Sequence, residues 1–246
     1  MARDADGRRG SPDGVRRVAV RTDVAALIPA YQAEATVAQV VAGARQHCAR
    51  VIVVDDGSSD ATAARAQAAG AECLRHERNV GKGAAIRTGL AALARTQVGR
   101  ALTLDADGQH LAAEMPPLLA ASDASPEAIV VGVRQKRGHT IARAARFGNW
   151  IADGLLRWIA GRPLPDTQCG FRVYPVGATL QLHADGPRYE FETEVLLRAA
   201  RRGMPIVGVP VRVHYPPVAE RVSHFRPWVD TLRIIAIVLR VLVRRA

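Results

Sequence analysis

Cysteine is scarce in this chain and follows no pattern. The 246 residues include three cysteines, Cys48, Cys73 and Cys169, and no two of them form a Cys-x-x-Cys pair. Three widely spaced cysteines without a Cys-x-x-Cys pair argue against both a disulfide framework and a zinc site. We therefore expect a reducing, cytoplasmic location.

Aromatic residues and lysine are also rare. Aromatics make up 4% of the chain, which leaves few stacking platforms for single-stranded nucleic acid, and no DNA-reading motif is present. Only Lys82 and Lys136 are lysines among the 34 basic residues, and the net charge is +11. Such an arginine-rich surface attracts phosphates, nucleic acid or anionic lipid. We expect no nucleic-acid partner, but a non-catalytic nucleotide- or nucleic-acid-binding protein stays an alternative.

Long apolar segments are missing, and both ends of the chain are polar or basic. No run approaches the roughly 20 apolar residues that a membrane-spanning helix needs. Residues 1–22 lack the apolar core of a signal peptide and are expected to be a disordered tail. Residues 232–243 are strongly apolar but contain Arg233 and Arg240, and within the segment 231–246 these two share roughly one helical face with Arg244. This predicts a basic amphipathic helix on a membrane surface, with a helix docked on the core as the alternative.

Short apolar runs alternate with helical patterns along the rest of the chain. Strands are expected at 24–28, 51–54, 73–74, 101–104 and 129–133, with an edge strand at 206–213. Helices are expected at 34–47, from about 61, at 83–95 and at 190–202, and residues 163–177 are expected to be largely loop. Continuous apolar strands separated by helices predict an α/β fold, with a mostly parallel central sheet covered by helices on both faces.

Two acidic clusters follow predicted strands. Asp55 and Asp56 come after one apolar run, and Asp105, Asp107 and Gln109 come after another. Parallel sheets bind ligands beyond the carboxyl ends of their strands. Three oxygen ligands in one short turn suit Mg²⁺ or Mn²⁺, which also keeps positions for waters and substrate phosphates. The pattern suggests a metal-assisted site for a nucleotide diphosphate, although Asp and Gly are also ordinary turn residues.

Five segments in order carry a resemblance to one family. They are IPAYQ at 28–32, VVDDGSSD at 53–60, NVGKG at 79–83, DADGQH at 105–110 and DTQCGFR at 166–172. Over about residues 23–230 the chain resembles a family 2 glycosyltransferase of the GT-A fold, nearest to the dolichol- or polyprenol-phosphate mannosyltransferase-like enzymes. The resemblance implies that 23–230 form a catalytic domain. It also implies inverting transfer of a hexose from a GDP- or UDP-linked sugar to a lipid-linked acceptor, with polyprenyl phosphate as the first choice, and the use of a divalent cation.

The resemblance also implies roles for individual residues on the donor side. The implied donor-binding residues are Pro29, Tyr31, Asp55, Asp56, Lys82, Asp105 and Arg221. Asp105, Asp107 and Gln109 would hold Mg²⁺ or Mn²⁺ and the diphosphate. For Lys82, a solvated lysine before a helix is the alternative interpretation. The usual acidic residue after the first motif is replaced by Ala33, with Glu34 one position later, which leaves the choice between GDP and UDP open.

On the acceptor side, the resemblance implies a group of arginines and a candidate base. Arg134 matches the position that grips the lipid phosphate, with Arg143 or Arg146 for a second contact. A lipid phosphate is already ionised, whereas a hydroxyl of a lipid or glycan precursor would need a carboxylate base. Asp166 is the first candidate for that base. Glu192 and Glu194 are the next candidates. We expect attachment to the cytosolic face of the membrane to be peripheral.

Overall fold

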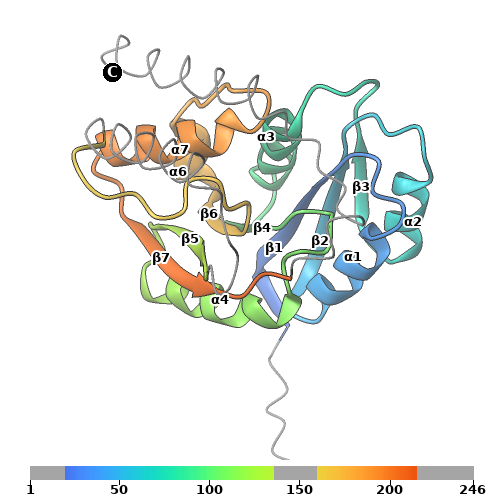
Figure 1. Cartoon of the computed structure of the whole chain (residues 1–246), viewed down its shortest axis with the longest axis horizontal. Coiled ribbons are helices and arrows are strands. Elements are labelled where there is room, and N and C mark those ends of the chain that lie inside the picture. Colours follow the sequence, from blue (N-terminus) through green and yellow to red (C-terminus); the bar gives the residue numbers. More distant parts are fainter. Residues whose placement is uncertain (1–19, 136–159, 215–246) are drawn as a thin grey trace, which may run out of the picture.

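The computed structural model describes residues 20–135 and 160–214, which form a seven-stranded sheet with helices on both faces (Figure 1). The strands are β1 (Arg21–Ala30), β2 (Cys48–Asp55), β3 (Glu72–Arg75), β4 (Arg100–Thr103), β5 (Ile129–Arg134), β6 (Arg172–Pro175) and β7 (Ile206–Val211). The helices are α1 (Val37–Arg45), α2 (Thr62–Ala68), α3 (Lys82–Leu93), η1 (Ala112–Glu114), α4 (Met115–Ala124), α6 (Val176–Gln181) and α7 (Glu190–Arg201).

The sheet is mostly parallel, as the apolar runs predicted. Its strand order is β3-β2-β1-β4-β6-β5-β7, and only β6 runs antiparallel to its neighbours β4 and β5. The six predicted strands are confirmed, including β7 at the edge of the sheet. Pro210 fits that edge because proline has no amide hydrogen for the ladder.

The prediction of loop at 163–177 was wrong in its second half, which forms β6 and the start of α6. β6 is only four residues long, and its sequence offers no period that distinguishes it from loop. Its backbone is fixed by strands distant in the sequence, because Arg172 pairs with Thr103 of β4 and with Val131 of β5. Helix α4 was not predicted either. Two prolines open this helix, at positions where a missing amide hydrogen costs little.

Two apolar layers hold the helices against the sheet. Along β1, Val24, Ala26 and Ile28 face one layer, while Ala25 and Leu27 face the other, as the two-residue period of a strand requires. The first layer includes residues of α1, α2 and α4, and the second includes residues of α3, α6 and α7. Figure 1 shows these two sets of helices on opposite faces of the sheet.

This topology collects the polar strand ends at one edge of the sheet. The last residues of β1 and β2 are in register, with Ala30 opposite Asp55. Asp105 follows the parallel strand β4 by two residues, and Arg134 ends β5. Helix α3 begins at Lys82, so its first turn lies near the same edge.

Within residues 20–135 and 160–214, no helix has the length and apolar character that crossing a bilayer requires. The predicted tail 1–22 lies almost wholly outside these ranges, and the predicted amphipathic helix 231–246 lies entirely outside them.

The close packing of α3 on β1 generates a stability prediction. A Cβ added at Gly89 would lie 2.1 Å from Cδ1 of buried Leu27. We therefore expect Gly89→Ala to lower the free energy of unfolding by about 1–3 kcal/mol, the usual cost of overpacking a core. Chemical denaturation measures this directly.

Gly177→Ala is the matched control, because nothing lies within 4 Å of the added Cβ in α6. There the same change should raise stability by up to about 1 kcal/mol, the difference in helix propensity. Equal stability of the two variants would contradict the packing described for α3.

Candidate active site

A partly buried lysine lies at the centre of the polar edge. Lys82 Nζ is 2.6 Å from Asp105 Oδ1 and 3.0 Å from Glu192 Oε1. Burial opposes the charged form of the lysine, but the two carboxylates outweigh it and raise the pKa of Lys82 above its usual range. The same ammonium lowers the pKa of Asp105, although burial acts in the opposite direction. Lys82 therefore stays charged. Its two ion pairs join the start of α3 to the turn after β4, through Asp105, and to α7, through Glu192.

Gly170 permits this ion pair by its lack of a side chain. A Cβ at this position would lie 2.6 Å from Asp105 Oδ1 and 2.7 Å from Lys82 Nζ. The backbone of the loop is held in place by Thr103, whose hydroxyl donates to the Gly170 carbonyl at 2.8 Å. The DTQCGFR loop thus passes directly over the charged pair.

The acidic turn after β4 is fixed by its own backbone and by His110. The Asp105 amide donates to His110 Nδ1 at 3.2 Å, and the imidazole stacks on Phe171 with 5.0 Å between ring centres. Burial lowers the pKa of His110 to about 4, so the ring is neutral and Nδ1 can accept. The Gln109 amide donates to Asp107 Oδ1 at 2.9 Å. The predicted metal ligands therefore share one ordered turn.

The charges in this turn fit a divalent cation. Burial, together with the negative charge of Asp105, raises the pKa of Asp107 to about 6, which indicates uncompensated negative charge. Within the part of the chain that the structure describes, no group of three or more His, Cys, Asp or Glu side chains could hold a metal. The protein would thus supply Asp105, Asp107 and Gln109, and waters or substrate phosphates would complete the shell, as Mg²⁺ commonly requires.

The two aspartates at the end of β2, Asp55 and Asp56, differ in their surroundings. Asp55 Oδ1 accepts from the Ser58 amide at 3.0 Å, and Oδ2 lies 3.3 Å from Arg75 Nε. The Asp56 carboxylate is bonded to His76 Nδ1 at 2.7 Å and accepts from the amides of Val80 and Gly81.

These contacts suggest different tasks for the two residues. Asp56 secures the loop that leads into Lys82. Asp55, at the strand end beside Arg75, remains the better candidate for reading a nucleobase. Pro29 is buried and Tyr31 is half-buried at the adjoining end of β1.

Glu194 lies on the other side of α7 from the Lys82 pair and is wholly buried. Its carboxylate accepts from the amides of Asp185 and Gly186 and pairs with Arg198 at 2.7 Å. It therefore holds the loop before α7, whereas Glu192, two residues earlier, contacts Lys82.

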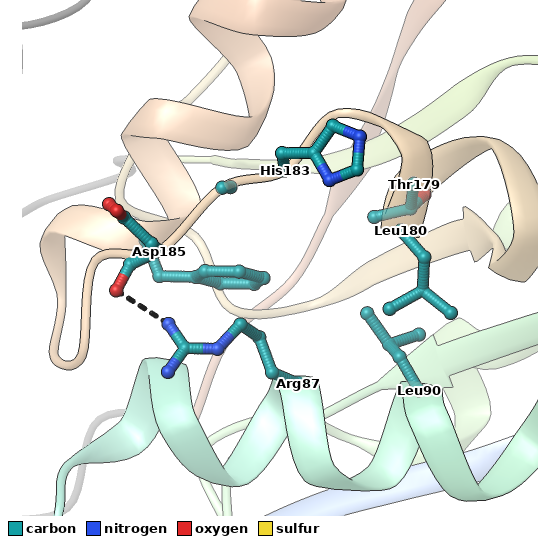
Figure 2. Close-up of a pocket in the computed structure, with 8 residues that line it drawn as sticks. Arg87, Leu90, Thr179, Leu180, His183 and Asp185 are labelled. Carbon is teal, nitrogen blue, oxygen red and sulfur yellow. Dashed lines mark hydrogen bonds between the residues drawn. The ribbon is translucent and has the colours of Figure 1, made fainter.

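Figure 2 shows the same loop from the α3 side, where it borders a pocket of about 550 Å³. Arg87 of α3 donates to the carbonyl of Asp185 at 2.6 Å. Further along the loop, the Ala84 amide donates to the Pro187 carbonyl at 2.9 Å. These bonds clamp the loop against the first turns of α3 and support the position of Lys82.

Arg134 and Asp166 form a second ion pair at this edge. Arg134 Nε and Nη2 donate to the two Asp166 oxygens at 2.6 and 2.8 Å, a bidentate arrangement. Burial would raise the pKa of Asp166, but the guanidinium outweighs it and lowers the pKa. The residue predicted to bind an acceptor phosphate thus contacts the residue predicted to act as a base.

The sequence profile of the family described as "Glycosyl transferase family 2" matches residues 25–177. This match runs from the middle of β1 to the start of α6 and includes the acidic turn and the DTQCGFR loop. The chain belongs to glycosyl transferase family 2. The resemblance stated from the motifs is therefore confirmed.

Two curated proteins are similar in sequence to this glycosyltransferase over about three quarters of its length. It is 27% identical over 212 residues to a UDP-N-acetylglucosamine–dolichyl-phosphate N-acetylglucosaminyltransferase of Methanococcus voltae, covering 77% of this chain and 84% of that protein. It is 28% identical over 205 residues to the polyprenol monophosphomannose synthase of Mycolicibacterium smegmatis, covering 75% of each.

A solved structure confirms the predicted GT-A fold. Glucosyl-3-phosphoglycerate synthase from Mycobacterium tuberculosis, solved with Mn²⁺, UDP and glucosyl-3-phosphoglycerate, matches this glycosyltransferase with a TM-score of 0.70. The identity is 23%, over 90% of this chain and 80% of that one.

Some of the predicted site residues lie outside the described part of the glycosyltransferase. These are Arg143, Arg146 and Arg221. Other residues that shape the site were not predicted from the sequence. Gly170, His110 and Arg172 all belong to the quoted motifs, but their tasks depend on contacts with distant segments. The roles predicted for Asp105, Asp107 and the other site residues remain predictions.

The contact at Gly170 generates a prediction about activity. In Gly170→Ala the new methyl group should separate Lys82 from Asp105, because these two side-chain ends can move more easily than the backbone. We expect sugar transfer to fall by about tenfold or more, the scale at which misplaced groups slow a reaction. The melting temperature should change little.

Gly99→Ala, where nothing lies within 4 Å of the added Cβ, is the control and should keep the wild-type rate. A folded Gly170→Ala enzyme with the wild-type rate would show that the Lys82–Asp105 pair is not needed.

Proposed function

We propose that this glycosyltransferase transfers a hexose, with inversion, from a nucleotide-diphosphate sugar to the phosphate of a polyprenyl lipid. The observation that carries the proposal is the pair of partly buried, ion-paired cations at one sheet edge. Lys82 lies beside the acidic turn, and Arg134 lies at the end of β5. One cation suits the donor's diphosphate and the other suits an acceptor phosphate. The names of the two relatives, which act on dolichyl or polyprenol phosphate, support the same acceptor class.

The donor would lie across the ends of β1, β2 and β4. Asp55, with Pro29 and Tyr31, would contact the nucleoside. Asp105, Asp107 and Gln109 would hold Mg²⁺ or Mn²⁺, which would neutralise charge on the departing nucleoside diphosphate. Lys82 adds a fixed positive charge beside this position, which stabilises the same developing charge. GDP and UDP both stay open as the nucleotide.

The acceptor phosphate would bind at Arg134. The planar guanidinium already forms a bidentate pair with the Asp166 carboxylate, and a phosphate offers the same pair of oxygens. A phosphate would therefore exchange with Asp166 or share the guanidinium with it. Arg143 and Arg146 remain proposed for a further contact.

The ion pairs at this edge favour a phosphate over a hydroxyl acceptor. Each candidate base is already paired with a cation: Asp166 with Arg134, Glu192 with Lys82, and Glu194 with Arg198. For Asp166 this pairing lowers the pKa, which makes the carboxylate a weaker base. A phosphate monoester is ionised at neutral pH and can attack without a strong base. Transfer to a hydroxyl of a lipid or glycan precursor is the less favoured alternative.

A lipid acceptor places the reaction at a membrane surface. We propose peripheral attachment on the cytosolic side, with the amphipathic segment 231–246 as the anchor. The arginines of that segment would attract anionic lipid head groups.

The test is transfer of labelled hexose from GDP- and UDP-linked sugars to polyprenyl phosphate, with polyprenyl alcohol as the hydroxyl control. The wild type should label the phosphate and not the alcohol. Asp107→Ala should lower kcat by about 100-fold or more, because it removes a ligand that helps stabilise transition-state charge. Removal of divalent cations by a chelator should have the same effect.

Glu72→Ala is the matched control, because Glu72 is the first residue of the outermost strand β3, where its exposed carboxylate pairs with Arg50. It should keep the wild-type rate. Wild-type turnover by a folded Asp107→Ala enzyme would refute the metal assignment, and labelling of the alcohol alone would favour the hydroxyl alternative.

A further inference from the structure

Arg172 is an unusual cation in this molecule, because it is fully buried and its hydrogen-bond acceptors include no carboxylate. Its guanidinium donates to the carbonyls of Thr167, Cys169 and Glu192, each at 2.7 Å, and to the Tyr174 hydroxyl at 3.3 Å. Burying a charge is costly unless an opposite charge pairs with it directly, and the nearby Glu192 carboxylate raises the pKa of Arg172 without accepting a hydrogen bond from it. Stability alone is therefore a weak reason for a guanidinium at this position.

The acceptors of Arg172 come from the two segments that meet at the site. Thr167 and Cys169 lie in the loop that carries Asp166 and Gly170. Glu192 lies in the first turn of α7, and its carboxylate contacts Lys82. A single planar group therefore fixes the loop on the acceptor side relative to the helix on the donor side.

We propose that Arg172 is a positioning residue, which sets the acceptor loop 166–170 relative to Lys82 and Glu192. It touches neither substrate and acts through backbone carbonyls. Only the fork of arginine can reach three carbonyls in different directions, because lysine is a single point charge with three clustered donors. This inference rests on the proposed transfer to a lipid phosphate, and it adds a residue to which that proposal gives no role.

The geometry separates acceptor use from nucleotide binding. Arg172 contacts the loop that holds Asp166 against Arg134. Among the described residues, its guanidinium forms no hydrogen bond with the ends of β1 and β2, where the nucleoside would bind. A shift of the loop should disturb the acceptor phosphate and its alignment with the donor sugar. Binding of the nucleotide alone should stay the same.

The test compares Arg172→Lys with Arg100→Lys. Arg100 is also mostly buried, but it pairs with Asp23 and Asp123 at the opposite end of β4. In Arg172→Lys we expect kcat/KM for polyprenyl phosphate to fall about 10- to 100-fold, the effect of misaligned reactants, with a higher acceptor KM. The Kd for UDP or GDP with Mn²⁺ should stay within about twofold of the wild type, because no contact of the nucleoside pocket is removed. Arg100→Lys should change neither quantity.

A second variant tests the same inference if Arg172→Lys does not fold. Thr103→Val removes the hydroxyl that holds the Gly170 carbonyl from the β4 side, and should raise the acceptor KM without changing nucleotide affinity. The inference is overturned if the loop variants lose nucleotide affinity and acceptor use in parallel, or if their acceptor kinetics equal those of Arg100→Lys. A wild-type enzyme that transfers to no polyprenyl phosphate would instead overturn the proposed function, and this inference with it.

Discussion

The ion pair between Lys82 and Asp105 is the interaction on which the site depends. It joins the first residue of α3 to the turn after β4, and the Glu192 carboxylate joins α7 to the same ammonium. Three segments distant in the sequence therefore meet at one charge. In a partly buried position such a contact is stronger than on the open surface, but it must also offset the cost of removing each charge from water. The surrounding loops meet this requirement by fixing the geometry.

Much of the polar network around this pair serves to hold backbone in place. Asp56 secures the loop before Lys82, Glu194 and Arg87 secure the loop before α7, and Arg172 secures the loop that carries Gly170. Buried polar groups of this kind rigidify a site when they are hydrogen-bonded. Lys82, Asp105 and Arg134 are thereby held in fixed positions. In the proposed reaction, this is the preorganisation that charge stabilisation in a transition state requires.

The sequence predicted those features of the fold and the site that depend on residues close together in the chain. The apolar runs located six strands, and the position of Asp55 and Asp105 after two of them predicted a site at the carboxyl edge of the sheet. The prediction failed where distant partners decide the structure, as for β6, which is fixed by pairing on both sides. It also could not distinguish a carboxylate that faces Lys82, as Glu192 does, from one that binds backbone amides, as Glu194 does. Side-chain partners of this kind are a tertiary property.

The most direct test of this account is thermal denaturation of the wild-type enzyme with Mn²⁺, UDP and GDP, each alone and in combination. A ligand that binds only the folded state raises the melting temperature as its concentration exceeds Kd. If the acidic turn and Lys82 form a shared site for a cation and a diphosphate, one nucleotide with Mn²⁺ should stabilise the protein more than the sum of the separate effects. Equal stabilisation by nucleotide without the cation, or no stabilisation by either nucleotide, would contradict the account.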